Sequence, residues 1–83
     1  MDERKFRTWA KREGLRFHLS FNSDGQVEKA SAFDVNWTQI DAAQKRWPGR
    51  WREGGDGQFR YAHTEIDSIA VVLHIDPNCM VSA

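Results

Sequence analysis

Alternation of apolar and polar side chains from residue 15 onward constrains the fold more than any other feature of this sequence. A period of two is typical of a strand that buries one face. The segment 22–25, Asn-Ser-Asp-Gly, then predicts a type I turn closed by a glycine bulge, with Asn22 opposite Gln26. The apolar positions of the strand are Leu15, Phe17, Leu19 and Phe21.

The turn also sets the register of the strand that follows. It pairs Phe21 with Val27 and Leu15 with Phe33, so we expect Val27 and Phe33 to face the same core as the first strand. The sequence therefore predicts an antiparallel hairpin over residues 15–33.

Helical spacing of apolar residues occurs on both sides of this hairpin. Asp2 can cap a first helix, and Gly14 supplies a left-handed stop after it. The apolar positions of this helix are Phe6, Trp9 and Ala10.

A second helix is predicted to begin after Asn36. Gln39 completes a capping box with Asn36, Val35 can pack on Ile40, and Pro48 ends the helix. The apolar stripe of this helix comprises Trp37, Ile40, Ala43 and Trp47.

The last third of the chain predicts further strands. Residues 51–63 contain a glycine-rich segment at 54–57 and predict a second hairpin. Residues 68–75 are nearly all β-branched or apolar, which predicts a central strand covered on both faces or on most of both. We therefore predict one α+β domain over residues 1–83, in the order α-β-β-α-β-β-β. It has an antiparallel sheet of about four to five strands with two helices packed on one face.

Length and composition limit the class of protein. The chain has 83 residues, of which 40% are hydrophobic and 29% charged, so it has room for one small folded domain. Its longest apolar run, residues 69–73, is too short to cross a membrane, which takes ~20 residues. The charged N-terminus lacks a signal-peptide stretch, and a lone Cys79 cannot close an internal disulfide. We expect a cytoplasmic protein, in the host cytoplasm if a phage encodes it.

Patterns for catalysis and metal binding are lacking in the sequence. Cys79 with His74 and Asp76 supplies the residue types of a nucleophilic site but no recognisable local motif. No CxxC, HxxxH or HExxH spacing occurs. We expect His63 and His74 to lie roughly 20 Å apart, too far to share one ion. The sequence predicts no enzyme, no metal site and no cofactor.

Charge is distributed unevenly along a chain whose net charge is zero. Residues 1–16, 17–43, 44–61 and 62–83 carry net charges of +3, −3, +3 and −3. The third block interleaves its cations with aromatic rings, and four of its five cations are arginines, which pair with phosphate or carboxylate and stack on rings. The binding residues predicted from this block are Arg46, Arg50, Trp51, Arg52, Arg60 and Tyr61.

Three interpretations of this block stay open. In the first, the block is a protein-binding hot spot anchored by Trp51. In the second, it is a nucleic-acid surface on which arginines contact phosphates and a ring stacks on a base. In the third, Trp47 and Tyr61 belong to the core and the arginine heads are merely solvated. Zero net charge counts against a dedicated nucleic-acid binder. Association as a monomer or a homodimer is also left open, with an uncovered edge strand near residues 50–53 as the pairing surface.

The cluster Trp47-Pro48-Gly49-Arg50-Trp51, the small size and the lack of a catalytic motif give the chain a general resemblance to one class of proteins. These are the small α+β proteins that phages and mobile elements encode to block host machinery, with anti-CRISPR proteins the best known. The resemblance implies a steric inhibitor that occupies a larger host protein or ribonucleoprotein. Our leading hypothesis is a non-enzymatic binding protein of this kind. The alternative is an accessory protein that binds single-stranded nucleic acid through the arginine and tryptophan cluster.

Overall fold

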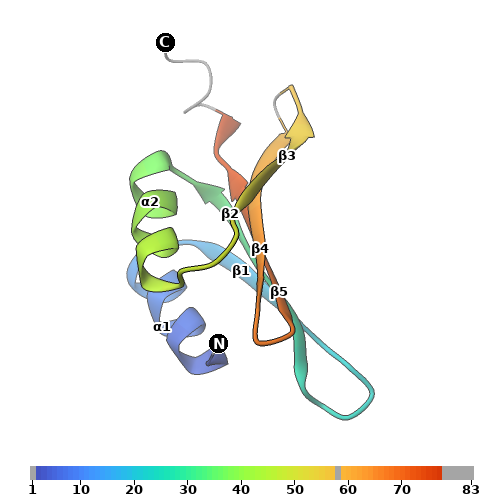
Figure 1. Ribbon diagram of the computed structural model, residues 1–83. Helices are drawn as coiled ribbons and strands as arrows, with labels where there is room; N and C mark the ends of the chain where they lie inside the picture. Colours follow the sequence, from blue (N-terminus) through green and yellow to red (C-terminus); the bar gives the residue numbers. More distant parts are fainter. Residues whose placement is uncertain (1, 58, 78–83) are drawn as a thin grey trace.

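The chain folds into a five-stranded sheet with both helices on one side of it (Figure 1). The structure is a computed structural model and describes residues 2–57 and 59–77. The expected α+β class and the element order α-β-β-α-β-β-β are confirmed. The elements are α1 (Glu3–Arg12), β1 (Arg16–Phe21), β2 (Val27–Val35), α2 (Trp37–Arg46), β3 (Arg52–Asp56), β4 (Phe59–Ile66) and β5 (Ile69–Ile75).

The sheet is mixed, and the prediction of an antiparallel sheet needs this correction. Its strand order is β1-β2-β5-β4-β3, and β2 and β5 pair in parallel while the other three pairs are antiparallel. The reason is the connection through α2, which returns the chain so that β3 runs in the direction of β2. β4 is antiparallel to β3 and β5 is antiparallel to β4, so β5 also runs in the direction of β2. β1 and β3 are the edge strands, and whether an edge pairs with a second copy stays a prediction.

The turn of the first hairpin is confirmed. The Asn22 amide donates to the Gln26 carbonyl at 2.8 Å, and the Gly25 amide donates to the Asn22 carbonyl at 3.0 Å. Gly25 has a φ of 77°, a left-handed conformation that glycine adopts at no steric cost. Phe21 pairs with Val27, as the turn requires.

The register beyond this turn differs from the prediction by one residue. Phe21 pairs with Val27 but Ser20 pairs with Lys29, so β2 contains a bulge at Glu28. Phe33 therefore lies opposite Arg16 rather than opposite Leu15. Because side chains alternate between the two faces of a sheet, this shift turns Phe33 away from the helices.

Both helix starts are confirmed. Asp2 accepts a hydrogen bond from the Arg4 amide at 2.9 Å, and Asn36 and Gln39 form the reciprocal bonds of a capping box. The predicted stripe of α2 is wrong at its first position. Trp37, the first residue of the helix, is 43% exposed, whereas Ile40, Ala43 and Trp47 are buried.

An aromatic cluster joins the two helices to the sheet. Phe6 is fully buried, with its ring centroid 5.9 Å from those of Trp9 and Trp47 and 6.4 Å from that of Phe17. Trp9 and Trp47 meet edge to face at 5.4 Å, the geometry that aromatic pairs prefer. The buried strand residues beneath the helices are Ala30, Ala32, Val35, Ala62, Val71, Leu73 and Ile75. Their small alanines leave room for the rings, so two of the four tryptophans serve the core.

β5 lies at the centre of the sheet as predicted, but only one of its faces is covered. Val71 and Leu73 are buried under the helices, whereas Val72 and His74 on the other side are half-buried. No helix of the described part of the chain packs on that side (Figure 1). We call it the open face. It comprises Arg16, His18 and Ser20 of β1, Lys29, Ser31 and Phe33 of β2, Ala70, Val72 and His74 of β5, Phe59, Tyr61, His63 and Glu65 of β4, and Arg52, Gly54 and Asp56 of β3.

Within residues 2–57 and 59–77, neither helix has the length and apolar character needed to cross a membrane.

Candidate contact surface on the open face

The six predicted binding residues do not form one surface. Two of them belong to the junction between α2 and the core. Trp51 is half-buried, packs against the core and donates from its Nε1 to the Trp47 carbonyl oxygen at 2.9 Å. The Arg46 guanidinium lies over the Trp47 ring, 5.5 Å from its centroid. Trp51 is therefore part of the packing between the α2 end and the sheet rather than an exposed anchor.

Arg60 lies on the helix side of the β3–β4 hairpin. Its guanidinium donates to Glu53 at 2.9 Å, and both side chains are about half exposed. Because neighbours along a strand alternate between faces, Arg60 and Tyr61 point to opposite sides of the sheet. Arg60 and Tyr61 are adjacent in the sequence, but their side chains lie on opposite faces of the sheet.

Arg50, Arg52 and Tyr61 are associated with the open face. Arg52 pairs with His63, and Tyr61 pairs with His74, so both side chains lie on that face. Arg50 precedes β3, and its main-chain carbonyl accepts a hydrogen bond from the Thr64 hydroxyl at 2.9 Å. This bond holds the loop before β3 against the edge of β4.

A row of stacked side chains crosses four adjacent strands of the open face. The Arg16 guanidinium lies 5.1 Å from the centroid of the Phe33 ring. Phe33 stacks on His74 with centroids 4.7 Å apart and planes inclined by only 4°. Tyr61 then contacts His74 at 5.9 Å and His63 at 5.3 Å. The row joins β1, β2, β5 and β4 into one aromatic and cationic surface.

Sequence reasoning missed four members of this surface. Arg16, Phe33, His63 and His74 belong to four different strands, and Phe33 was expected in the core. The expected separation of His63 and His74 is also wrong, since both contact the Tyr61 ring. The tight turn at Asp67, where the backbone has a φ of 52°, brings His74 opposite Tyr61.

Gly54 makes room for the Tyr61 ring. A Cβ built at Gly54 would lie 2.6 Å from Cζ and 2.7 Å from Oη of Tyr61, closer than real atoms approach. The hydroxyl end of the ring therefore lies over the β3 backbone. Only glycine at position 54 leaves this place for the ring.

The open face carries more cations than carboxylates. Arg16, Lys29 and Arg52 lie on it with Asp56 and Glu65, and so do all three histidines of the chain. Arg16 is loosely paired with Asp34 at 3.9 Å. Burial, and secondarily the charge of Lys29, lower the pKa of His74 from its usual 6.5. The first basic block contributes Arg16 to the open face, since its other cations belong to α1, and the third block contributes Arg52, with Arg50 beside it.

A hollow of about 490 Å³ adjoins the row at the end of β3. Its lining residues are Arg50, Arg52, His63, Thr64, Glu65 and Ala70. We call it the arginine hollow. Since His63 contacts both the hollow and the Tyr61 ring, the row and the hollow are continuous.

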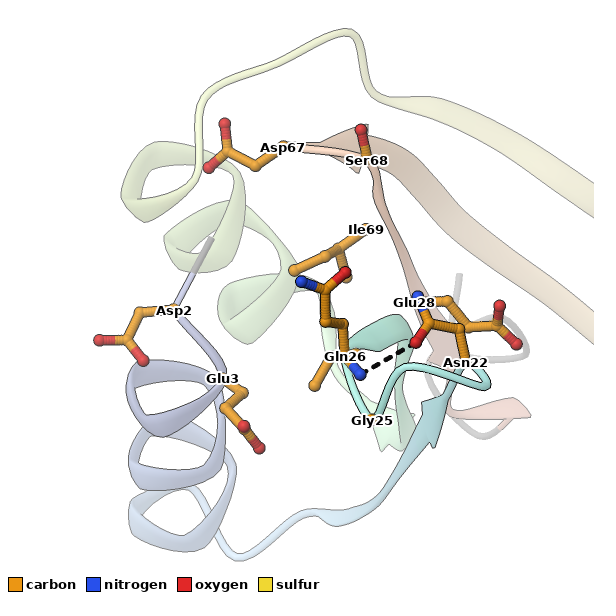
Figure 2. Close-up of a pocket in the computed structure, with 10 residues that line it drawn as sticks. Asp2, Glu3, Asn22, Gly25, Gln26, Glu28, Asp67, Ser68 and Ile69 are labelled. Carbon is orange, nitrogen blue, oxygen red and sulfur yellow. Dashed lines mark hydrogen bonds between the residues drawn. The ribbon is translucent and has the colours of Figure 1, made fainter.

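A second hollow, of about 540 Å³, has the opposite charge. Figure 2 shows it between the start of α1, the β1–β2 turn and the β4–β5 turn, with the Gln26 amide bonded to the Asn22 side chain at 3.0 Å. Its carboxylates belong to Asp2, Glu3, Glu28 and Asp67. This hollow is therefore lined by carboxylates, whereas guanidinium groups line the arginine hollow.

Among residues 2–57 and 59–77, no group of three or more histidine, cysteine, aspartate or glutamate side chains could hold a metal ion. Cys79, considered above as a nucleophile, lies outside the described residues.

Comparison with known proteins adds no identification. No family model, no curated protein and no solved structure matches this chain.

Proposed function

We propose that this chain is a non-enzymatic binding protein that holds single-stranded nucleic acid against its open face. The observation that carries the proposal is the row formed by Arg16, Phe33, His74 and Tyr61 across four strands. It places aromatic rings across the strands β2, β5 and β4, near one end of the open face, with the Arg16 guanidinium over the Phe33 ring. Several single-strand binders use this combination, in which rings stack on bases and cations follow the phosphates.

Two rings at the β4 end of the row are the proposed base contacts. Tyr61 is half-buried at the end of the row, and Phe59, two residues away on the same face, is 79% exposed. Residues two apart on one strand lie about 7 Å from each other, which suits successive bases. Phe33 and His74 stack on each other, so they support Tyr61 from the side rather than receiving a base.

The cations of the open face set the expected strength and salt dependence. If Arg16, Lys29 and Arg52 each neutralise one phosphate, the slope of log K against log salt is about −2. Affinity then falls about 20-fold between about 50 and 200 mM salt. Such binding is modest, in keeping with a chain of zero net charge.

Fluorescence anisotropy with a labelled strand of about 12 nucleotides tests this proposal. Tyr61→Ala is expected to cost about 1–3 kcal/mol of binding free energy, the usual loss of one stacked base. Arg16→Gln is expected to lower the salt slope by about 0.7.

Two matched controls lie away from the open face. Phe21→Ala removes a phenyl ring that is 47% exposed at the far end of β1, and Arg12→Gln removes an exposed cation from α1. Both variants should bind as the unaltered chain does. Equal losses in Tyr61→Ala and Phe21→Ala, or no binding of DNA or RNA strands at low salt, refute the proposal.

The inhibitor hypothesis is the second candidate, favoured by one observation. Phe59 projects near the tip of the β3–β4 hairpin with 79% of its surface exposed, and exposed aromatic side chains are frequent anchors of protein interfaces. In this proposal the chain is a steric inhibitor of the anti-CRISPR kind, and the hairpin docks on a larger protein or ribonucleoprotein. The test measures target binding by a CRISPR effector complex with and without the chain. Inhibition that Phe59→Ala abolishes supports it, and no inhibition by the unaltered chain rejects it.

A further inference from the structure

The arginine hollow contains cationic groups that the fold itself does not use. Neither Arg50 nor Arg52 forms an ion pair with a described residue, whereas Arg7, Arg16 and Arg60 each do. The loop that carries Arg50 is held by its main-chain carbonyl, so its guanidinium is not needed for that contact. Two guanidinium groups that form no ion pair within residues 2–57 and 59–77 thus line one hollow.

The hollow carries a net positive charge, which favours the more highly charged of two anions. Arg50 and Arg52 supply two positive charges, Glu65 removes one, and the His63 imidazole can add a hydrogen bond. A phosphodiester inside a strand carries one charge, whereas a terminal phosphate carries about −1.5 to −2 at neutral pH. Guanidinium groups bind phosphate oxygens through paired, charge-assisted hydrogen bonds. This set of side chains therefore binds a terminal phosphate more strongly than an internal phosphodiester.

The hollow also lies where a bound strand would end. β3 pairs with β4 only as far as Arg52 opposite His63, and beyond that pair the loop before β3 is bonded to Thr64. His63 contacts the Tyr61 ring at 5.3 Å. Because Arg52 pairs with His63, the phosphate group of a nucleotide stacked on Tyr61 would lie beside these two side chains, in the hollow that Arg50 also lines.

We propose that the hollow formed by Arg50, Arg52 and His63 binds the terminal phosphate of a single-stranded nucleic acid whose last base stacks on Tyr61. This inference rests on the proposed function and adds to it a preference for phosphorylated strand ends. The hollow's volume of about 490 Å³ accommodates a phosphate group with its bound water.

The experiment compares strands of one sequence that differ only in their ends. One carries a 5′-phosphate, one a 3′-phosphate and one hydroxyl groups at both ends, and each competes, without a label, against the same internally labelled strand. One of the phosphorylated strands is expected to bind about tenfold more tightly than the hydroxyl strand, from one additional charge-assisted contact. Arg50→Gln should bring that ratio close to one.

The ratio of affinities is the readout, because it cancels any general loss of binding. Arg16→Gln, at the other end of the row, should weaken all strands and leave the ratio unchanged. If the unaltered protein binds all three strands equally, this inference is wrong but the proposed function stands. The same conclusion follows if Arg50→Gln leaves the ratio of affinities unchanged. If no strand binds but a phosphoserine peptide does, both proposals are overturned and the hollow belongs to a protein interface.

Discussion

Replacing Phe6 by alanine tests the packing that holds the two helices on the sheet. The Phe6 side chain is 0% exposed and contacts the rings of Trp9, Phe17 and Trp47. Removal of a buried phenylalanine ring costs about 3–5 kcal/mol, because the lost burial adds to the cost of the cavity. A chain of 83 residues has a free energy of unfolding of about 4–12 kcal/mol, so Phe6→Ala removes a large share of it.

Urea unfolding followed by tryptophan fluorescence measures this loss, since Trp9 and Trp47 both touch the Phe6 ring. Phe21→Ala is the control, with an expected loss below about 1 kcal/mol for a ring that is 47% exposed. If Phe6→Ala does not fold, Phe6→Leu provides a smaller change, with an expected loss of about 1–2 kcal/mol. A loss at Phe6 no larger than that at Phe21 refutes the packing described.

Three further predictions follow from the open face and the helix start. Gly54→Ala should displace the Tyr61 ring, lower the affinity for the strand as Tyr61→Ala does, and cost about 1 kcal/mol of stability. Unchanged strand affinity and unchanged NMR shifts of the Tyr61 ring would contradict this prediction. The pKa of His74 is lowered, so the unfolded chain takes up the proton first. The contribution of His74 to the free energy of unfolding is therefore fully present above pH 6.5 and is lost as the pH falls below that value. His74→Gln should flatten this pH dependence, measured by urea unfolding. Asn36→Ala removes a capping bond and should cost about 1 kcal/mol, measured by the same unfolding assay.

Signals that act over a few residues predicted the local structure well. The turn at residues 22–25, the cap at Asp2 and the capping box of Asn36 with Gln39 all formed as expected. Each depends on hydrogen bonds between residues two to four apart, so the sequence of the segment itself specifies them. The α+β class followed from these elements in order.

The candidate site was only partly predictable. Of the six predicted binding residues, Arg52 and Tyr61 lie on the open face, whereas Trp51 packs against the core and Arg60 lies on the other side of the sheet. Closeness in the sequence does not show which side chains share a face, because a strand directs neighbours to opposite sides. The row itself joins residues from strands that are far apart in the chain.

The sequence by itself determined the helices, the strands and the turns of this protein, because short-range hydrogen bonds and apolar periodicity specify them. Only the tertiary structure decided which residues became the open face. A single extra residue at Glu28 shifts the pairing of β1 and β2 and moves Phe33 from the expected core to a stack on His74. The physical reason is that register depends on the packing of the whole sheet, and a shift by one residue reverses the face of every side chain beyond it.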